Sequence, residues 1–171
     1  MFKIEAHALV WAKELLKPTG RSDQADSPVN PFRTQFDLYY LCLLIGILSG
    51  RQLACGSDLK DMTRTFPEAY FEYRHLIAGL LLASELKTAG LPIEKRQVQR
   101  KVVEFLRSDT QTFLSAEAVE LMNGYAAAGF EIMRENLPKP PSEPHEFLIW
   151  YHEEMIPAAI AIGPLLLTTE G

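Results

Sequence analysis

The sequence predicts an all-α protein, a single compact domain of five to six helices packed as an orthogonal or irregular bundle. Apolar residues recur at helical spacing through most of the chain, and clusters of glycine and proline separate these segments. No stretch of useful length alternates between apolar and polar residues in the manner of a half-buried strand. A length of 171 residues with 47% hydrophobic content suits one globular domain.

The first part of the chain predicts two helices joined by a linker. A helical spacing runs over residues 3–17 and ends before the turn-forming residues 18–31, which favour a loop or linker. A very hydrophobic second helix is expected over residues 32–49, closed by Gly50. We expect residues 51–65 to form an irregular connection.

The middle of the chain predicts three more helices. The third is expected over residues 66–89, the fourth over residues 93–107 and the fifth over residues 115–137. Ser115 is a favourable N-cap for the fifth helix, because a serine hydroxyl accepts a hydrogen bond from a free backbone amide in the first turn. We expect the second, third and fifth helices to be central to the fold.

The C-terminal part predicts a connector, a helix and a tail. Residues 138–144 are rich in proline and favour a stiff, extended connector, and a last helix is expected near residues 145–155. The patterns divide the chain into an N-terminal helix and linker (1–31), a helical core domain (32–156) and an irregular C-terminal tail (157–171).

Small residues inside the fifth helix predict a close packing contact. Gly124, Ala127 and Ala128 lie three and four residues apart, so they share one helix face. Glycine inside a helix costs about 1 kcal/mol relative to alanine, so we expect close packing to offset that loss. Replacing Gly124 or Ala128 with leucine is expected to overpack a helix crossing.

Composition favours a cytoplasmic protein that does not enter a membrane. The net charge of −5 argues against broad, nonspecific nucleic-acid binding. Cys42 and Cys55 have the spacing of neither a zinc knuckle nor a disulfide framework, which favours a reducing compartment. Residues 1–17 lack the pattern of a secretory signal, and the longest apolar run, residues 38–48, is too short for a bilayer.

Candidate catalytic and metal-binding patterns are sparse. No serine lies in a nucleophile elbow and no phosphate-binding glycine loop is present, so we predict a protein that is not an enzyme and needs no cofactor. Glu72 and His75 form one Glu-x-x-His pair, but a di-iron bundle requires two, and the sequence contains no second pair. The alternative is a small homo-oligomeric protein that binds a metal or small ligand through Glu72, His75 and His152.

The fourth helix carries a basic face. Arg96, Arg100 and Arg107 fall on one side of an ideal helix, opposite apolar residues such as Val98 and Phe105. This face is either a contact for DNA phosphates or an acidic partner, or a solvated surface, because such charge runs are common on exposed helices.

Aromatic residues are concentrated near the third helix. A stripe at helical spacing is expected to lie in the core, and it consists of Phe66, Tyr70, Tyr73 and Ile77. Phe71 lies outside this stripe, and such a surplus aromatic residue is typical of a partner interface.

Two helical segments resemble a known family. The first contains Phe36-Asp37-Leu38-Tyr39, then Gly46 and Gly50-Arg51; the second contains Asn123-Gly124-Tyr125-Ala126 and Gly129-Phe130. This pattern resembles small proteins associated with DNA phosphorothioation (Dnd) systems. The resemblance implies an accessory subunit in a bacterial antiphage or DNA-modification cluster and carries over no catalytic residues. With the rich core and surplus aromatics, it predicts a non-catalytic helical subunit of a multiprotein assembly, with other protein subunits as partners.

Overall fold

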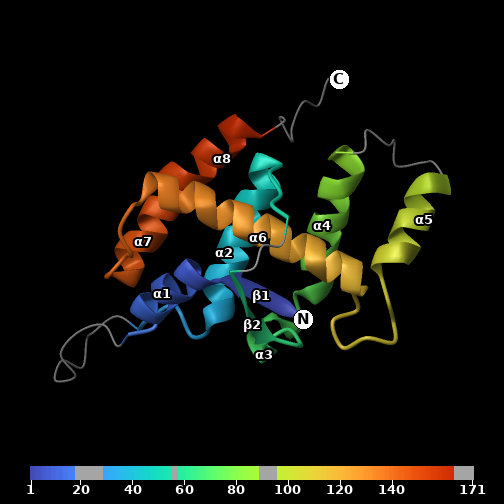
Figure 1. Cartoon of the computed structure of the whole chain (residues 1–171), viewed down its shortest axis with the longest axis horizontal. Coiled ribbons are helices and arrows are strands. Elements are labelled where there is room, and N and C mark those ends of the chain that lie inside the picture. Colours follow the sequence, from blue (N-terminus) through green and yellow to red (C-terminus); the bar gives the residue numbers. More distant parts are fainter. Residues whose placement is uncertain (18–28, 55–57, 89–95, 164–171) are drawn as a thin grey trace.

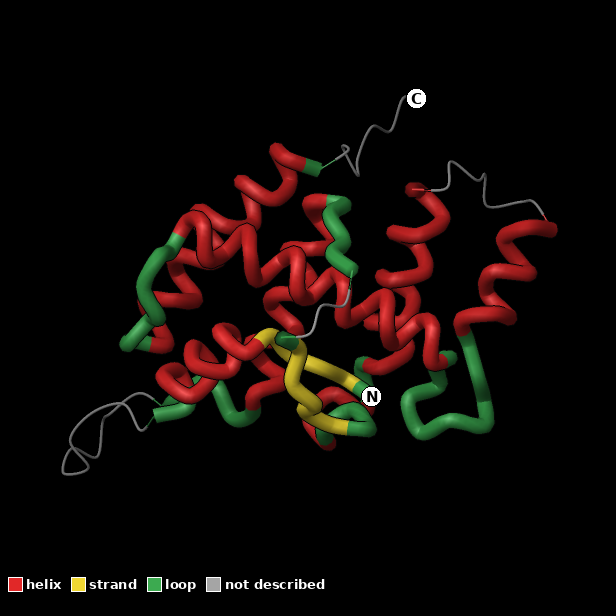
Figure 2. The backbone as a smooth tube through the Cα atoms, viewed as in Figure 1, coloured by secondary structure: helices red, strands yellow, loops and turns green. Residues whose placement is uncertain are grey.

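The computed structural model describes residues 1–17, 29–54, 58–88 and 96–163. These residues are mostly helical, as predicted, and include one small antiparallel sheet that the sequence did not predict (Figures 1 and 2). The elements in chain order are β1 (Phe2–Glu5), α1 (Ala6–Leu15), α2 (Gln35–Ser49), β2 (Leu59–Thr63), α3 (Glu68–Phe71), α4 (Arg74–Thr88), α5 (Arg96–Phe105), α6 (Ala116–Asn136), α7 (Pro144–Trp150), the π-helical turn η1 (Tyr151–Met155) and α8 (Ile156–Ile162). No helix in the described part of the chain is long and apolar enough to cross a membrane.

The core is centred on the crossing of α2 and α6, which confirms the predicted central place of the second and fifth helices. A Cβ atom on Gly46 would overlap the backbone carbonyl of Tyr125, and one on Gly129 would overlap that of Cys42. The two backbones therefore touch, and only glycine fits at both positions. Gly50 ends α2 in the left-handed conformation, as predicted for its closing residue.

The predicted packing residues of α6 are buried, but Gly124 faces a different neighbour. Ala127 and Ala128 are nearly inaccessible to solvent. A Cβ on Gly124 would lie 2.6 Å from the carbonyl oxygen of Leu53, whose backbone amide donates to the Gly124 carbonyl at 3.1 Å. Gly124 therefore packs against the segment after α2, whereas Gly129 makes the close approach to α2 itself.

The N-terminal helix begins later than predicted, because residues 2–5 form a strand. Strand β1 pairs antiparallel with β2, which lies inside the connection predicted to be irregular. Phe2 and Ile4 are buried, whereas the two residues that follow them are partly accessible, which is the alternation of a strand. Both expectations were wrong because a four-residue strand is too short to separate from the helical spacing that follows it.

Asn123 of α6 fixes this strand in place. Its side-chain oxygen accepts from the backbone amide of Lys3 and from the Tyr39 hydroxyl, both at 3.0 Å. Its side-chain nitrogen donates to the Met1 carbonyl at 3.1 Å. Because Asn123 is buried, these hydrogen bonds satisfy a side chain that would otherwise be costly to bury.

The predicted third helix is broken into α3 and α4. Tyr70, in α3, donates a 2.6 Å hydrogen bond to the Asp37 carboxylate and packs against Phe36, so α3 is held at the start of α2. Helix α4 instead buries Ile77 and Leu81 in the core. The break between these two anchorages overturns the prediction of one continuous helix over residues 66–89, and the predicted end at Gly90 lies outside the described residues.

The chain beyond Pro157 is helical up to Ile162, where the sequence predicted an irregular tail. Pro157 is the second residue of α8, two residues after the end of the π-helical turn η1. The π-helical turn η1 joins α7 to α8 without leaving the helical path. Gly163 then closely approaches the Leu48 carbonyl, so the end of α8 packs on α2.

Candidate functional site

The most unusual surface of the molecule lies on α3 and α4. Four large apolar side chains are exposed there: Phe71 (50%), Tyr73 (57%), Leu76 (59%) and Leu80 (36%). We call these four residues the α3–α4 surface. Tyr73 was predicted to belong to the core stripe and does not, because the break before α4 turns it outward, whereas Phe66 and Ile77 of that stripe are buried.

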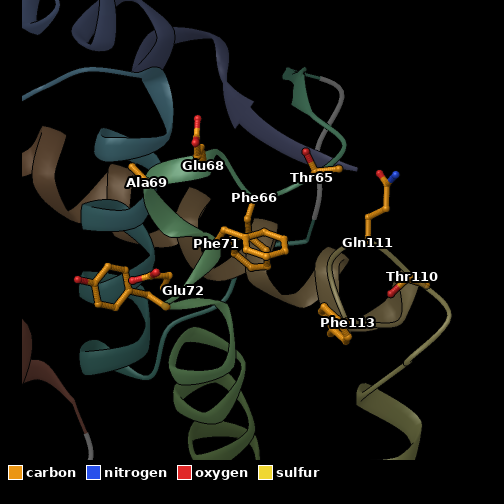
Figure 3. Close-up of a pocket in the computed structure, with 10 residues that line it drawn as sticks. Thr65, Phe66, Glu68, Ala69, Phe71, Glu72, Thr110, Gln111 and Phe113 are labelled. Carbon is orange, nitrogen blue, oxygen red and sulfur yellow. The ribbon is translucent and has the colours of Figure 1, made fainter.

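Two hollows lie beside this surface. The larger hollow has a volume of about 920 Å³, and the smaller hollow about 600 Å³. Figure 3 shows the larger one, with Phe66 and Phe71 on one side and Phe113, from the segment before α6, on another; the complete lining is Thr65, Phe66, Glu68, Ala69, Phe71, Glu72, Tyr73, Thr110, Gln111 and Phe113. The smaller hollow is lined by Pro31, Arg33, Thr34, Asp37, Tyr40, Ala69, Tyr70, Tyr73 and Leu76. Ala69 and Tyr73 line both, so the hollows adjoin.

Arg74 holds the rings of the larger hollow in place. Its guanidinium carbon lies 3.6 Å from the centre of the Phe71 ring and 4.7 Å from that of Phe113. The guanidinium also donates to the Phe71 carbonyl, while Nε is buried without a hydrogen-bond partner among the described residues. The His75 ring packs against Phe113 at 5.3 Å. Two rings from distant segments are thus fixed around one cation.

Phe113 adopts a backbone conformation that is rare for a side chain of its size. Its φ of 57° lies in the left-handed region. Hydrogen bonds close the preceding turn, since the Phe113 amide donates to Thr110 at 3.1 Å and its carbonyl accepts from Arg107 at 2.9 Å. A strained conformation that the surroundings enforce is a feature that clusters at functional sites.

The smaller hollow is built on the start of α2. One oxygen of Asp37 accepts from the backbone amides of Arg33 and Thr34, both at 2.7 Å, and the other accepts from Tyr70. Burial and the neighbouring Asp37 carboxylate raise the pKa of the Tyr70 phenol above its ordinary range, so this hydroxyl stays protonated. The Tyr40 ring lies 5.5 Å from that of Tyr70 and completes an aromatic wall.

The larger hollow carries two carboxylates. Glu68 and Glu72 are exposed and form no ion pair with another described residue. Arg74 contacts the aromatic rings of Phe71 and Phe113 and forms no ion pair with either carboxylate. The hollow therefore combines exposed aromatic side chains with two carboxylates that form no ion pair with a described residue.

The predicted basic face is only partly assembled. Arg96 and Arg100 are exposed on α5, but the helix ends at Phe105. Arg107 lies beyond that end and forms an ion pair with Asp109 at 3.2 Å. The three arginines therefore do not share one continuous helix face, because the chain leaves the helix to close the turn before Phe113.

The alternative metal ligands are not brought together. Glu72 is the residue after α3, His75 is the second residue of α4, and His152 is exposed in η1. Within the described part of the chain, no group of three histidine, cysteine, aspartate or glutamate side chains is arranged to hold a metal ion. The break between α3 and α4 also removes the single helix on which the Glu-x-x-His pair was placed.

Sequence reasoning identified Phe71 as a surface aromatic but missed Leu76, Leu80 and Phe113. The signal for the leucines was present, because α4 has apolar residues on more of its circumference than one buried stripe needs. Comparisons of the chain with protein-family models, curated proteins and solved structures gave no match.

Proposed function

We propose that this protein is a non-catalytic helical subunit that binds a partner protein through the α3–α4 surface. The observation that supports this most directly is the joint exposure of Phe71, Tyr73, Leu76 and Leu80. Exposed apolar residues scattered singly are normal, but here Phe71 and Tyr73 line one hollow and Tyr73 and Leu76 line the adjoining one, an arrangement typical of a binding surface.

The large apolar side chains of this surface, two of them aromatic, favour high-affinity rather than transient binding. Fully burying a large apolar side chain contributes about 1.5–3 kcal/mol, and aromatic residues are enriched at the centres of interfaces. Phe71 and Phe113 are already fixed by Arg74, so binding restricts little additional side-chain motion. Tyr73 faces both hollows and therefore occupies the centre of the proposed interface.

Affinity purification from the source organism tests this proposal. We would compare the wild-type chain with the double variant Tyr73→Gln/Leu76→Gln at moderate salt, with and without nuclease. We expect proteins that co-purify with the wild type to survive nuclease and to be lost with the variant, because both substituted side chains are more than half exposed. Calorimetry with each purified partner would then measure direct binding.

A matched control is available on other faces of the molecule. Val10 and Ile149 are exposed to 49% and 59%, so Val10→Gln/Ile149→Gln removes a similar amount of exposed apolar surface elsewhere. This control should retain every partner. Retention of the partners by Tyr73→Gln/Leu76→Gln would overturn the proposal, and a wild-type dimer that this variant converts to a monomer would identify a second copy of the chain as the occupant instead.

The resemblance to Dnd-associated proteins supplies a more specific proposal for the assembly. It rests on residues 36–51, which are mostly in α2, and on Asn123 to Phe130 of α6. If it holds, the captured partners include enzymes that modify or cleave DNA. Partners from an unrelated process would contradict this assignment while leaving the binding surface itself in place.

The basic residues near α5 are a separate candidate contact. Arg96 and Arg100 are exposed without an ion pair to another described residue. If they contact phosphate or an acidic partner, reversal of Arg96, Arg100 and Arg107 to glutamate weakens binding and reduces its dependence on salt. Unchanged binding would identify a solvated face.

A further inference from the structure

We propose that the larger hollow receives a cationic side chain, an arginine or lysine carried by a basic segment of the partner protein. This inference rests on the proposed function and specifies the chemistry of the partner. Three features of the hollow support it: exposed aromatic rings, two carboxylates, and Arg74, which already lies against two of the rings.

The aromatic faces of the hollow are suited to a cation. The π-electrons of Phe and Tyr attract ammonium and guanidinium groups placed over the ring, and the attraction grows when water is excluded. Phe71 and Tyr73 line the hollow and are each at least half exposed, so ring surface remains available. Phe66 also lines the hollow, and its side chain is buried.

Arg74 shows that these rings accommodate a guanidinium. It lies 3.6 Å from the Phe71 ring centre and reaches Phe113 as well. No carboxylate compensates its charge in the described structure, so the rings themselves provide its favourable environment. Arg74 lies over the Phe71 ring, and Phe71 as a whole is still half exposed to solvent.

The two carboxylates select for positive charge. Glu68 and Glu72 both line the hollow, and neither is neutralised by a described cation. A cation in the hollow is therefore attracted by the negative charge of the two carboxylates as well as by the rings, whereas an anion would be repelled by that charge. The chain's net charge of −5 adds a longer-range attraction for a basic partner.

The smaller hollow differs in chemistry from the larger one, and this difference determines the orientation of the bound partner segment. It contains Tyr40, Tyr70 and Leu76, its Asp37 carboxylate is already engaged by three donors, and its one cationic lining residue is Arg33. A segment with a basic residue next to an apolar one matches the two hollows in only one orientation. Tyr73, which lines both, separates the two positions.

Nuclear magnetic resonance titration of the full-length chain tests the charge directly. The probe is N-acetyl-arginine amide, whose only charge is the guanidinium, and the comparison is N-acetyl-citrulline amide, which has the same shape without the charge. We expect arginine-probe shifts concentrated in α3 and around Phe113, with the citrulline probe about tenfold weaker because it lacks both the cation–π and the carboxylate attraction. Added salt should weaken only the arginine probe.

Paired variants attribute the binding to this hollow. Glu68→Gln/Glu72→Gln should weaken the arginine probe about fivefold, whereas Glu143→Gln/Glu146→Gln, an equal loss of exposed charge at α7, should leave it unchanged. Equal binding of both probes, no binding of the arginine probe, or equal weakening by the two double variants would each overturn the inference.

The same partner assay separates this inference from the proposed function. A partner that is retained by Glu68→Gln/Glu72→Gln but lost with Tyr73→Gln/Leu76→Gln would leave the binding surface standing and refute the cationic side chain. Retention of the partner by Tyr73→Gln/Leu76→Gln refutes the binding surface, whatever the arginine probe does.

Discussion

The crossing of α2 and α6 and the α3–α4 surface are both rich in apolar residues. At the crossing the two helix backbones are in direct contact, whereas the side chains of the α3–α4 surface are exposed to water. At the crossing, Gly46 and Gly129 remove side chains so that two backbones touch. On the surface, Phe71, Tyr73 and Leu76 add side-chain area that no described segment covers. Apolar content alone therefore does not identify the core, because close packing there also requires glycines, which have no side chain, at the points of backbone contact.

The contrast has an energetic side. Close packing of the two backbones at the crossing gains dispersion contacts. An exposed leucine or phenylalanine forgoes much of the roughly 1.5–3 kcal/mol that burial would provide. Burial of the α3–α4 surface by a partner would therefore contribute favourable free energy to binding.

The largest expected effect breaks the crossing. Gly129→Ala should lower the free energy of unfolding by about 3 kcal/mol or more, because even a methyl group overlaps the Cys42 carbonyl. Gly79→Ala is the matched control in α4: nothing lies within 4 Å of its added Cβ, so the better helix propensity of alanine should raise stability by about 0.8–1 kcal/mol. Urea denaturation of both variants measures the difference, and equal effects would show that the crossing tolerates a side chain.

A second effect removes the polar clamp beside the crossing. Asn123→Ala should lower the free energy of unfolding by about 2–3 kcal/mol, because it leaves the Tyr39 hydroxyl and the Lys3 amide without their acceptor. Asn136→Ala is the comparison, since its side chain donates to the Ile132 carbonyl near the exposed end of α6. A similar small loss for both variants would mean that water replaces the clamp.

Alkaline pH should lower the free energy of unfolding, because folding keeps a buried tyrosine hydroxyl protonated. Tyr151 is buried and donates to the Leu41 carbonyl at 2.8 Å, and its burial raises the pKa of the phenol. The unfolded chain then loses this proton first, so stability is intact below the ordinary tyrosine pKa of about 10 and falls as pH rises beyond it, by up to about 1.4 kcal/mol per pH unit.

Tyr151→Phe sharpens the pH prediction. The variant should be about 1 kcal/mol less stable at neutral pH because it loses one hydrogen bond. Its decline above pH ~10 should be shallower, though not absent, because burial also raises the pKa of Tyr70 and Tyr125. Parallel wild-type and variant curves from denaturation across that range would contradict the assignment.

The smallest effect is expected on the open surface. Tyr73→Gln/Leu76→Gln should change the free energy of unfolding by less than about 1 kcal/mol, because both side chains are mostly in water already. The same variant is expected to abolish partner binding. A loss of several kcal/mol would show that these residues belong to the core and would remove them from the candidate interface.

The elements that could be predicted are those whose signals are local. Helix α2 has a long apolar run closed by Gly50, and α6 begins at Ser115, whose hydroxyl accepts from the Ala118 amide at 3.1 Å. Strand β1 could not be predicted, because its partner β2 lies far along the chain and neither strand is long enough to show alternation. Pro157 was misleading for another reason: its effect depends on whether it begins a helical turn or interrupts one.

The candidate site was predictable in part for similar reasons. Phe71 fell outside the expected core stripe, and this was enough to place it at a surface. Ile77 was correctly placed in the core, but Leu76 was not recognised as exposed, because an apolar residue next to a buried stripe carries no mark of its own exposure. The contribution of Phe113 depends on a left-handed backbone and on Arg74 reaching across from another segment, and neither leaves a mark in the sequence.

The Asn123 clamp also has a consequence for how the chain matures on the ribosome. It joins Lys3 to a residue 120 positions later, and closing so long a loop is entropically slow. During synthesis, β1 meets β2 early, but it cannot be secured until α6 has emerged. We therefore expect β1 to lack its contacts with α6 through most of translation. The core should pack stably only after the last third of the chain has been synthesised.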